Sequence, residues 1–210
     1  MPANDSANGG AAAFPQLRRR WPLFGVAMAA AIALAVAVPL LTSTGPVVES
    51  TAQGQMRTIA LGDTTRVTLD SASSISVNSD NDRSVSLDRG RALFTVAHDA
   101  AHPFVVQAGD YQIHDLGTRF EVSRSAAQLV ISVAEGEVAV DGHGMQRVTA
   151  LPGQRITIAS SGTVSLSRID PALIASWHQG QLVYSDAALS VVVNDINRYA
   201  GTPVSLDPAL

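Results

Sequence analysis

The sequence predicts a mainly β protein that begins with a single transmembrane helix and ends in a partial, small α/β domain. Three features support this prediction: an uncharged apolar run at 21–41, short β-like runs separated by turn residues from Met56 onward, and an amphipathic helical pattern between two β-like runs after 181. We therefore divide the 210 residues into a disordered cytoplasmic tail (1–20), a transmembrane helix (21–41), a linker (42–54), a β domain (55–168) and a partial α/β domain (169–210).

The apolar run reads WPLFGVAMAAAIALAVAVPLL. As a helix it would be about 31 Å long, which matches the hydrocarbon core of a bilayer. Three arginines, 18–20, precede it and predict a cytoplasmic N-terminus with the rest of the chain exported. We therefore expect a single-pass protein of a bacterial inner membrane with a periplasmic C-terminal part. A cleaved signal peptide is the alternative, although 39–42 offers no small-x-small cleavage site.

The composition excludes several kinds of site. The chain has no cysteine, which rules out disulfides, thiol catalysis and cysteine metal sites. Its net charge of −4 argues against a nucleic-acid partner. No pattern in the sequence indicates a cofactor or a metal centre. Abundant Val, Ser and Thr favour strands.

The β domain should consist of many short strands. A turn is expected at Asp88-Arg89-Gly90, and a loop at 98–103 because Pro103 cannot donate to a ladder. A sandwich, a barrel and a coiled solenoid all fit this pattern. The expected strands are 58–61, 66–69, 74–77, 85–87, 92–96, 104–107, 111–114, 119–123, 128–133, 137–140, 146–150, 155–158 and 163–166.

The pattern changes at Asp170, which can cap a short helix running from Pro171 to Trp177 and ending by Gly180. A strand is expected at 181–184, and then an amphipathic helix capped by Ser185 or Asp186 and ended by Gly201. A last strand is expected at 204–206. Such a half domain leaves an apolar helix face and a sheet edge uncovered, so we expect it to continue or to pair with a partner. The apolar helix positions are Leu189, Val192, Val193, Ile196 and Tyr199.

Three short polar motifs could carry chemistry, but each fits a structural role better. His98, Asp99 and His102 could hold a metal, although a polar loop beside a proline explains them. His114-Asp115 lacks a serine in a nucleophile-elbow context. Glu135-Gly136-Glu137 fits a turn better than a glycosidase carboxylate pair. Residue chemistry alone therefore indicates an anchored β-rich binding or scaffold module and no enzyme.

Four ordered motifs within 83–140 are more specific, and they resemble the FecR family of inner-membrane signal transducers. Upstream Leu61-Gly62-Asp63 and downstream Trp177-x-x-Gly180-x-Leu182 extend the resemblance over most of 54–208. The four motifs are Leu87-x-x-Gly90-x-Ala92-x-Phe94-x-Val96, His98-Asp99 with Pro103-Phe104-x-Val106, Leu116-Gly117-Thr118-x-Phe120-x-Val122, and Val133-x-Glu135-Gly136-x-Val138-x-Val140.

The resemblance implies a twisted, solenoid-like periplasmic β domain followed by a small α/β domain like the short N-terminal domain of secretins and TonB-dependent receptors (STN-like). It implies a transducer that receives a signal from the N-terminal signalling domain of a TonB-dependent outer-membrane siderophore transporter and passes it to an extracytoplasmic-function (ECF) sigma factor. Strand addition to the half-built domain would then use Leu182, Tyr184, Val204 and Leu206. The alternative is a membrane-anchored periplasmic scaffold or ligand-binding module without sigma-factor contact.

The resemblance also implies possible self-cleavage between Gly117 and Thr118, as in some members, by attack of the threonine hydroxyl on the preceding carbonyl. A tight turn into a strand is the structural alternative for this pair. Members usually carry a helical sigma-binding domain before the span, whereas here only 1–20 precede it. We therefore expect either a fragment of a longer protein or a reduced member that does not hold the sigma factor itself.

Overall fold

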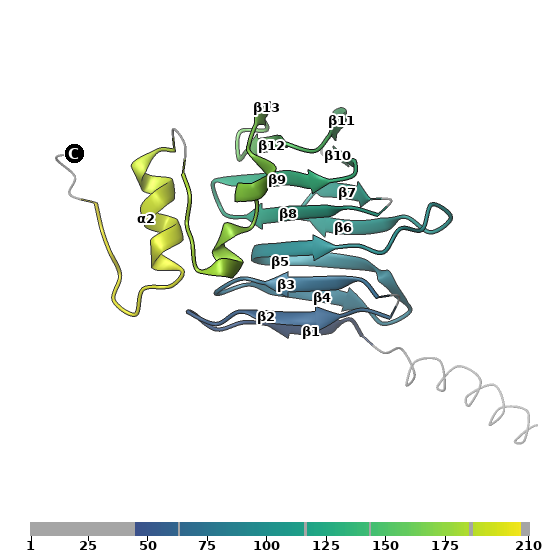
Figure 1. The fold of residues 1–210 in the computed structure, drawn as a ribbon, viewed down its shortest axis with the longest axis horizontal. Coiled ribbons are helices and arrows are strands. Elements are labelled where there is room, and N and C mark those ends of the chain that lie inside the picture. Colours follow the sequence, from purple (N-terminus) through teal and green to yellow (C-terminus); the bar gives the residue numbers. More distant parts are fainter. Residues whose placement is uncertain (1–44, 63, 116, 143, 185–186, 207–210) are drawn as a thin grey trace, which may run out of the picture. The chain divides into compact units, whose positions relative to one another are not determined.

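The computed structural model describes residues 45–62, 64–115, 117–142, 144–184 and 187–206 (Figure 1). The expected tail, the expected transmembrane helix 21–41 and the first residues of the expected linker lie outside this part of the chain. Within the described ranges no helix is long and apolar enough to cross a bilayer. All of the described residues belong to one compact unit.

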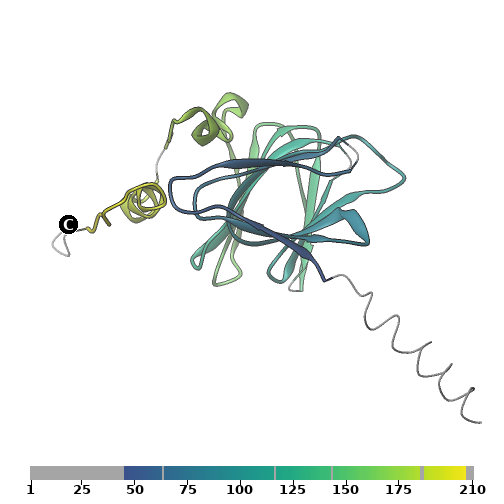
Figure 2. The same ribbon diagram turned by 90° about the horizontal axis from the view of Figure 1, so that it is seen from below.

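The prediction of a mainly β protein is confirmed, because the described residues contain thirteen strands that form two facing sheets (Figure 2). Apart from a parallel pairing of β5 with β6, the neighbours in both sheets are antiparallel. The first sheet runs β1 (Val47–Ser50), β4 (Ser74–Asn78), the first part of β5 (Asn81–Thr95), β6 (Phe104–Ala108), β7 (Tyr111–Asp115), β10 (Val138–Gly142) and β11 (Met145–Ala150). The second runs β2 (Arg57–Ala60), β3 (Arg66–Leu69), the last part of β5, β8 (Arg119–Arg124), β9 (Gln128–Glu135), β12 (Gln154–Ala159) and β13 (Val164–Arg168).

Strand β5 belongs to both sheets, and the turn expected at 88–90 is wrong. Its residues up to Arg89 pair with β4, and from Gly90 onward they pair with β8. At the crossing point Gly90 has φ +90°, and a Cβ there would lie 2.4 Å from Oγ of Ser73. The glycine therefore bends the strand from one sheet to the other without reversing it, which a sequence pattern cannot distinguish from a turn.

The core lies between the two sheets and follows the two-residue period of the strands. In β6, for example, Phe104, Val106 and Ala108 are buried while the residues between them are partly exposed. Three phenylalanines form its centre: the rings of Phe94 and Phe120 stack with centroids 5.1 Å apart, and Phe104 lies 6.0 Å from Phe94. Successive hairpins alternate between the two sheets.

The boundaries at the start of the domain differ from the prediction. Residues 47–50 form β1 inside the expected linker 42–54, because they pair with β4 in register from Val47↔Val77 to Ser50↔Ser74. Four residues with two exposed valines carry no alternation that a sequence pattern could detect.

The C-terminal part differs more. The expected helix 171–177 is two short 3-10 helices, η1 (Pro171–Leu173) and η2 (Ser176–Gln179), because Ile174 is extended and Ala175 has φ +56°. The caps are as expected: Oδ1 of Asp170 accepts the N–H of Ala172 at 2.9 Å, and Gly180 ends η2 with φ +78°.

The helix expected after 185 is α2 (Leu189–Asn197), with Ala188 as N-cap and Arg198 in place of Gly201 as C-cap. The expected capping residues 185 and 186 lie outside the described residues. The strands expected at 181–184 and 204–206 are wrong, since neither segment has regular structure. Near 204 a side chain takes the place of a partner strand: Asn197 bonds both the N–H and the carbonyl of Val204, at 2.7 and 2.8 Å.

Candidate partner-binding site

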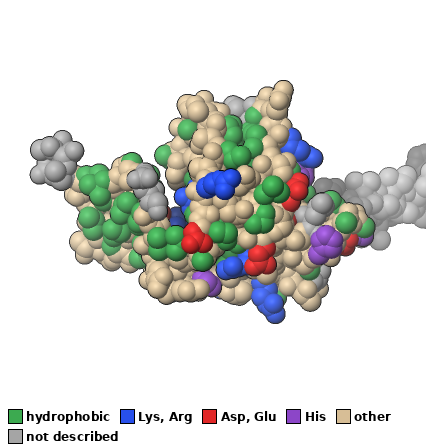
Figure 3. Space-filling model, turned by 45° about the horizontal axis from the view of Figure 1, so that its top comes forward, with side chains coloured by type: hydrophobic (Ala, Val, Ile, Leu, Met, Phe, Trp, Pro, Cys, Tyr) green, Lys and Arg blue, Asp and Glu red, His purple; other side chains and the backbone are tan. Residues whose placement is uncertain are grey.

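The C-terminal segment, residues 187–206, exposes apolar side chains that would normally lie in a core. Helix α2 has no buried residue. Figure 3 shows hydrophobic side chains gathered over this part of the molecule. A contiguous exposed apolar surface of this kind is typical of an interaction site. Its exposed members are Leu189 (54% exposed), Ile196 (37%), Val204 (45%) and Leu206 (37%).

An apolar groove of about 450 Å³ lies beside α2. One wall is Trp177, Gly180 and Leu182, and the other is Ile196, Tyr199 and Ala200. The first wall is packed against the β sandwich, because Trp177 is 3% exposed and lies in one buried cluster with Leu93 of β5 and Ala134 of β9. Its indole N–H donates to the carboxylate of Glu121 at 2.6 Å. The groove is within the size range of ligand pockets and has few polar groups to fix an orientation.

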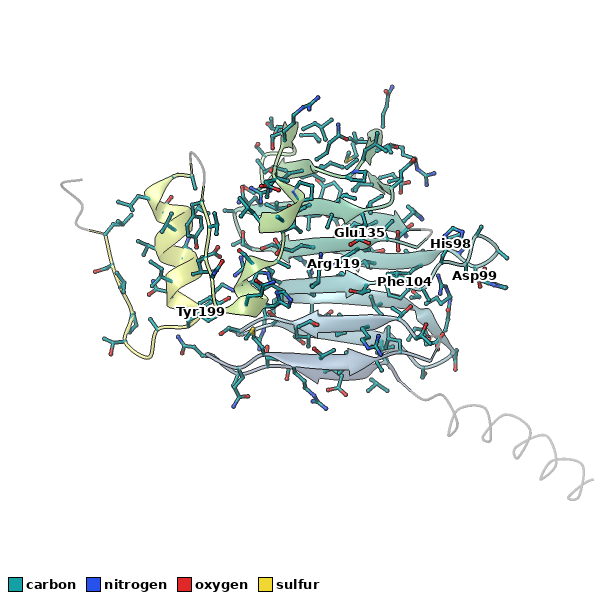
Figure 4. The ribbon with its side chains drawn as sticks, in the orientation of Figure 1. His98, Asp99, Phe104, Arg119, Glu135 and Tyr199 are labelled. Atoms are coloured by element: carbon teal, nitrogen blue, oxygen red, sulfur yellow. The ribbon has the colours of Figure 1, made fainter. Side chains whose placement is uncertain are left out.

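A polar cluster joins α2 to the β sandwich, and we refer to Asp70, Arg91, Asp195, Arg198 and Tyr199 as the Asp70 cluster. Its centre is the fully buried Asp70. The Asp70 carboxylate accepts hydrogen bonds from Nε of Arg91 at 2.7 Å, from the hydroxyl of Tyr199 at 2.6 Å and from the N–H of Ser71 at 2.7 Å. Arg91 also donates to Asp195 at 3.3 Å and to the Tyr199 hydroxyl at 3.1 Å. Figure 4 shows Tyr199 close to the C-terminal end of α2.

The surroundings of Arg91 and Tyr199 keep these two groups in their ordinary charge states. Burial alone would lower the pKa of the Arg91 guanidinium, but the carboxylates of Glu121, Asp195 and Asp70 outweigh it and raise the pKa. The guanidinium also lies 5.5 Å from the ring centroid of Trp177, within cation–π range. Burial and the hydrogen bond to Asp70 raise the pKa of Tyr199. Arg91 therefore stays charged and Tyr199 stays neutral at physiological pH.

The structure brings only part of the predicted partner surface together. Leu182 lines the groove, and the hydroxyl of Tyr184 donates to Asp195 at 3.1 Å. Val204 and Leu206 are exposed on the chain after α2 and do not line the groove. Sequence reasoning missed Asp70 and Arg91, although each is a charged residue directly beside a β-like run.

The Gly117-Thr118 pair lies in a confined polar site. The hydroxyl of Thr118 donates to Oδ1 of the fully buried Asp115, which also accepts the N–H of Gly117 at 3.2 Å. Gly117 has φ +131°, and a Cβ there would lie 2.4 Å from Cα of His98. A Cβ on Gly136 would lie 2.2 Å from the methyl group of Thr118. Both glycines are thus needed for the threonine and the aspartate to meet.

Neighbouring charged residues around this pair have simple roles. Arg119 and Glu135 lie side by side on β8 and β9, 4.0 Å apart (Figure 4). In the loop after β5, Asp99 accepts Nδ1 of His102 at 2.9 Å, and this bond lowers the pKa of its carboxyl. His114 faces Asp141 at 3.4 Å. In the part of the chain that is described, no three His, Cys, Asp or Glu side chains are grouped as metal ligands would be.

Comparison with known proteins identifies relatives of this fold. The model of a family described as FecR protein matches residues 47–139. No curated protein matches the chain. Two crystal structures are similar, each of a candidate anti-sigma factor from Parabacteroides distasonis ATCC 8503. The first, at 2.50 Å resolution, is 26% identical over 79% of each chain with a TM-score of 0.72. The second, at 1.65 Å, is 25% identical over 72% of this chain and 74% of the other, with a TM-score of 0.68.

Proposed function

Because residues 47–139 are a FecR domain, we propose that this chain is a signal-transducing regulator of a sigma factor. The observation that carries the proposal is the likeness to two candidate anti-sigma factors, which extends well beyond the matched domain into the remainder of the chain. A fold alone does not assign a function, so the site must supply a surface for a partner. The exposed apolar side chains of 187–206 supply one.

In this proposal the chain is anchored in the inner membrane by 21–41 and its periplasmic part receives the signal. The partner is the N-terminal signalling domain of a TonB-dependent outer-membrane transporter, and the signal is passed to an ECF sigma factor. Helix α2 and the chain after it would be covered by the partner, since no α2 residue is fully buried within the described residues and several apolar side chains of this segment are exposed. Burial of this apolar surface would drive association.

Calorimetric titration tests the proposal. The full chain, purified in detergent, is titrated with the N-terminal signalling domain of each TonB-dependent transporter of the same organism. We expect saturable binding to one of them. Leu206→Asp should weaken that binding at least about tenfold, whereas Leu166→Asp on β13, with 50% exposure, should not change it. If no signalling domain binds, the anchored scaffold or ligand-binding module becomes the better account.

A second candidate activity is self-cleavage between Gly117 and Thr118, and the hydrogen bond from the Thr118 hydroxyl to Asp115 favours it. In this reaction Oγ1 bonds to the Gly117 carbonyl carbon while its proton passes to Asp115. The carbon–nitrogen bond then breaks as the threonine nitrogen takes up the proton, which leaves an ester. Water hydrolyses the ester to a Gly117 carboxylate and restores the hydroxyl of a new N-terminal Thr118.

Mass spectrometry of the purified chain tests this activity. We expect fragments that end at Gly117 and begin at Thr118, absent in Thr118→Ala and formed more slowly in Asp115→Asn. The serine variant, Thr118→Ser, keeps a hydroxyl and should still be cut. Fragmentation of Thr118→Ala at the same bond would exclude the mechanism.

A further inference from the structure

Helix α2 is attached to the sandwich in an unusual way, by hydrogen bonds and ion pairs at its C-terminal end. No residue of α2 is fully buried, and of its apolar side chains only valines 191–193 are partly buried, so the apolar burial that normally holds a helix in place is small here. Tyr199 bonds Asp70 at 2.6 Å, and Arg198 donates to the carbonyl of Ser71 at 2.7 Å. From the sandwich side, Nε2 of Gln53 donates to the carbonyls of Asn197 and Ala200, at 2.8 and 2.6 Å.

Breaking these contacts would leave no isolated charge inside the sandwich. Asp70 and Arg91 both belong to the sandwich, and their 2.7 Å pairing persists if α2 moves away. Asp70 also keeps the N–H of Ser71. Removing one member of a buried ion pair carries a large free-energy penalty, because the other charge is left unpaired. Release of α2 leaves this pair intact, so its free-energy cost should be small.

Release would also leave no buried polar group without a partner on residues 187–206. Asp195 carries the charge that faces Arg91, and it also accepts the hydroxyl of Tyr184, at 3.1 Å. Tyr184 lies before the released residues 187–206, so on release the Asp195 carboxylate exchanges its contacts with Tyr184 and Arg91 for water. The backbone carbonyls of 197 and 200 that accept from Gln53 would be exposed to water on release and hydrated there.

The groove makes this attachment relevant to recognition. Trp177 and Leu182 lie on the sandwich side, and Ile196 and Tyr199 on the side of α2. The groove therefore exists only while α2 is attached. Any partner that needs both walls binds the attached form alone, and any partner that needs the freed helix binds the released form alone.

We propose that the Asp70 cluster is a latch that releases residues 187–206 from the sandwich while the sandwich itself stays folded, and that the latch thereby makes or removes the apolar groove. This inference does not depend on which partner the chain has. Its failure and that of the proposed function are distinguishable, because the latch is measured on the chain without any partner.

Hydrogen exchange with mass spectrometry of the full chain tests the latch. Amides of α2 should exchange at least about a hundredfold faster than those of β5, β8 and β9, because they open without global unfolding. In Gln53→Ala, which loses two hydrogen bonds from an exposed side chain, α2 should exchange about tenfold faster still, and the three strands should not change. Gln107→Ala on β6 is the matched control and should leave α2 unchanged.

A cross-link supplies the opposite perturbation. The chain has no native cysteine, so Gln53→Cys combined with Ala200→Cys can be bridged by a short bismaleimide. Bridging should slow α2 exchange at least tenfold, and the unbridged double variant should exchange faster than the native chain. Exchange of α2 at the rate of β5 in the native chain would overturn the latch. Gln53→Ala leaving α2 unchanged, or bridging that does not slow it, would do the same.

Discussion

Replacing Arg91 by methionine should be among the most destabilising single changes in this protein. The Arg91 side chain is 9% exposed, and its guanidinium pairs with the fully buried Asp70 at 2.7 Å. Methionine fills much of the same volume but leaves the carboxylate without its cation. Breaking a buried ion pair in this way costs about 3 to 5 kcal/mol. In this variant Asp70 keeps its hydrogen bonds from Ser71 and Tyr199 and its approach to Arg198. We therefore expect a loss at the lower end of this range, about 3 kcal/mol.

The assay is urea unfolding of the full chain followed by circular dichroism. With a slope of about 2 kcal/mol/M, the midpoint should fall by about 1.5 M. Arg147→Met is the matched control, because Arg147 makes a similar 2.7 Å pair with Asp141 but is 57% exposed. Such an exposed pair contributes about 0 to 1 kcal/mol, so its midpoint should hardly move.

A second variant identifies the cause. Asp70→Asn combined with Arg91→Met removes both charges and should recover at least about half of the loss, since no buried carboxylate is left unpaired. Equal midpoints for Arg91→Met and Arg147→Met would refute the reasoning. A double variant less stable than Arg91→Met would refute it too, because packing would then be the cause.

Two further predictions concern the strand crossing and the hydroxyls beside α2. Gly90→Ala should lower the free energy of unfolding by about 3 kcal/mol, through left-handed strain and a contact of 2.6 Å between the new Cβ and Cα of Ser73. Gly162→Ala, with φ +82° and nothing within 4 Å, should lower it by about 1 kcal/mol. Equal urea midpoints for the two variants would contradict the close contact. Burial and Asp195 raise the pKa of Tyr184 to about 12, and burial and Asp70 raise that of Tyr199. A raised tyrosine pKa stabilises the folded form below pH ~10 and loses that effect as pH rises through the folded value. Tyrosinate absorbance should thus show two late ionisations, one of them absent in Tyr199→Phe, and ionisation of both hydroxyls near pH 10 would contradict this.

The sequence predicted the β domain closely because each strand is specified locally. Residues such as 104–108 and 128–135 alternate or run apolar, and glycine or polar turns bound them, so period and punctuation suffice. Gly90 is the instructive failure. A glycine after two charged residues indicates a turn, and only the close approach of Ser73, which directly precedes β4, makes it a bend within β5.

The C-terminal part was predicted well only for α2, whose apolar period is strong. Its flanking strands were not formed, since a short β-like run pairs only if a second strand lies beside it. Here Asn197 bonds the backbone at 204, and Tyr184 turns its hydroxyl to Asp195. The sequence predicted a sheet edge as the partner surface, whereas the structure has an exposed helix and a groove.

The sequence by itself determined most of the strands, the amphipathic helix and the motifs that resemble the FecR family, because these depend on near neighbours in the chain. Only the tertiary structure decided which charges meet. Asp70, Arg91 and Tyr199 are far apart in sequence, and their pairing follows from the crossing of β5 and the position at which α2 ends. Charge pairing at a distance leaves no periodic signal, so neither the Asp70 cluster nor the groove beside it could be seen before the chain was folded.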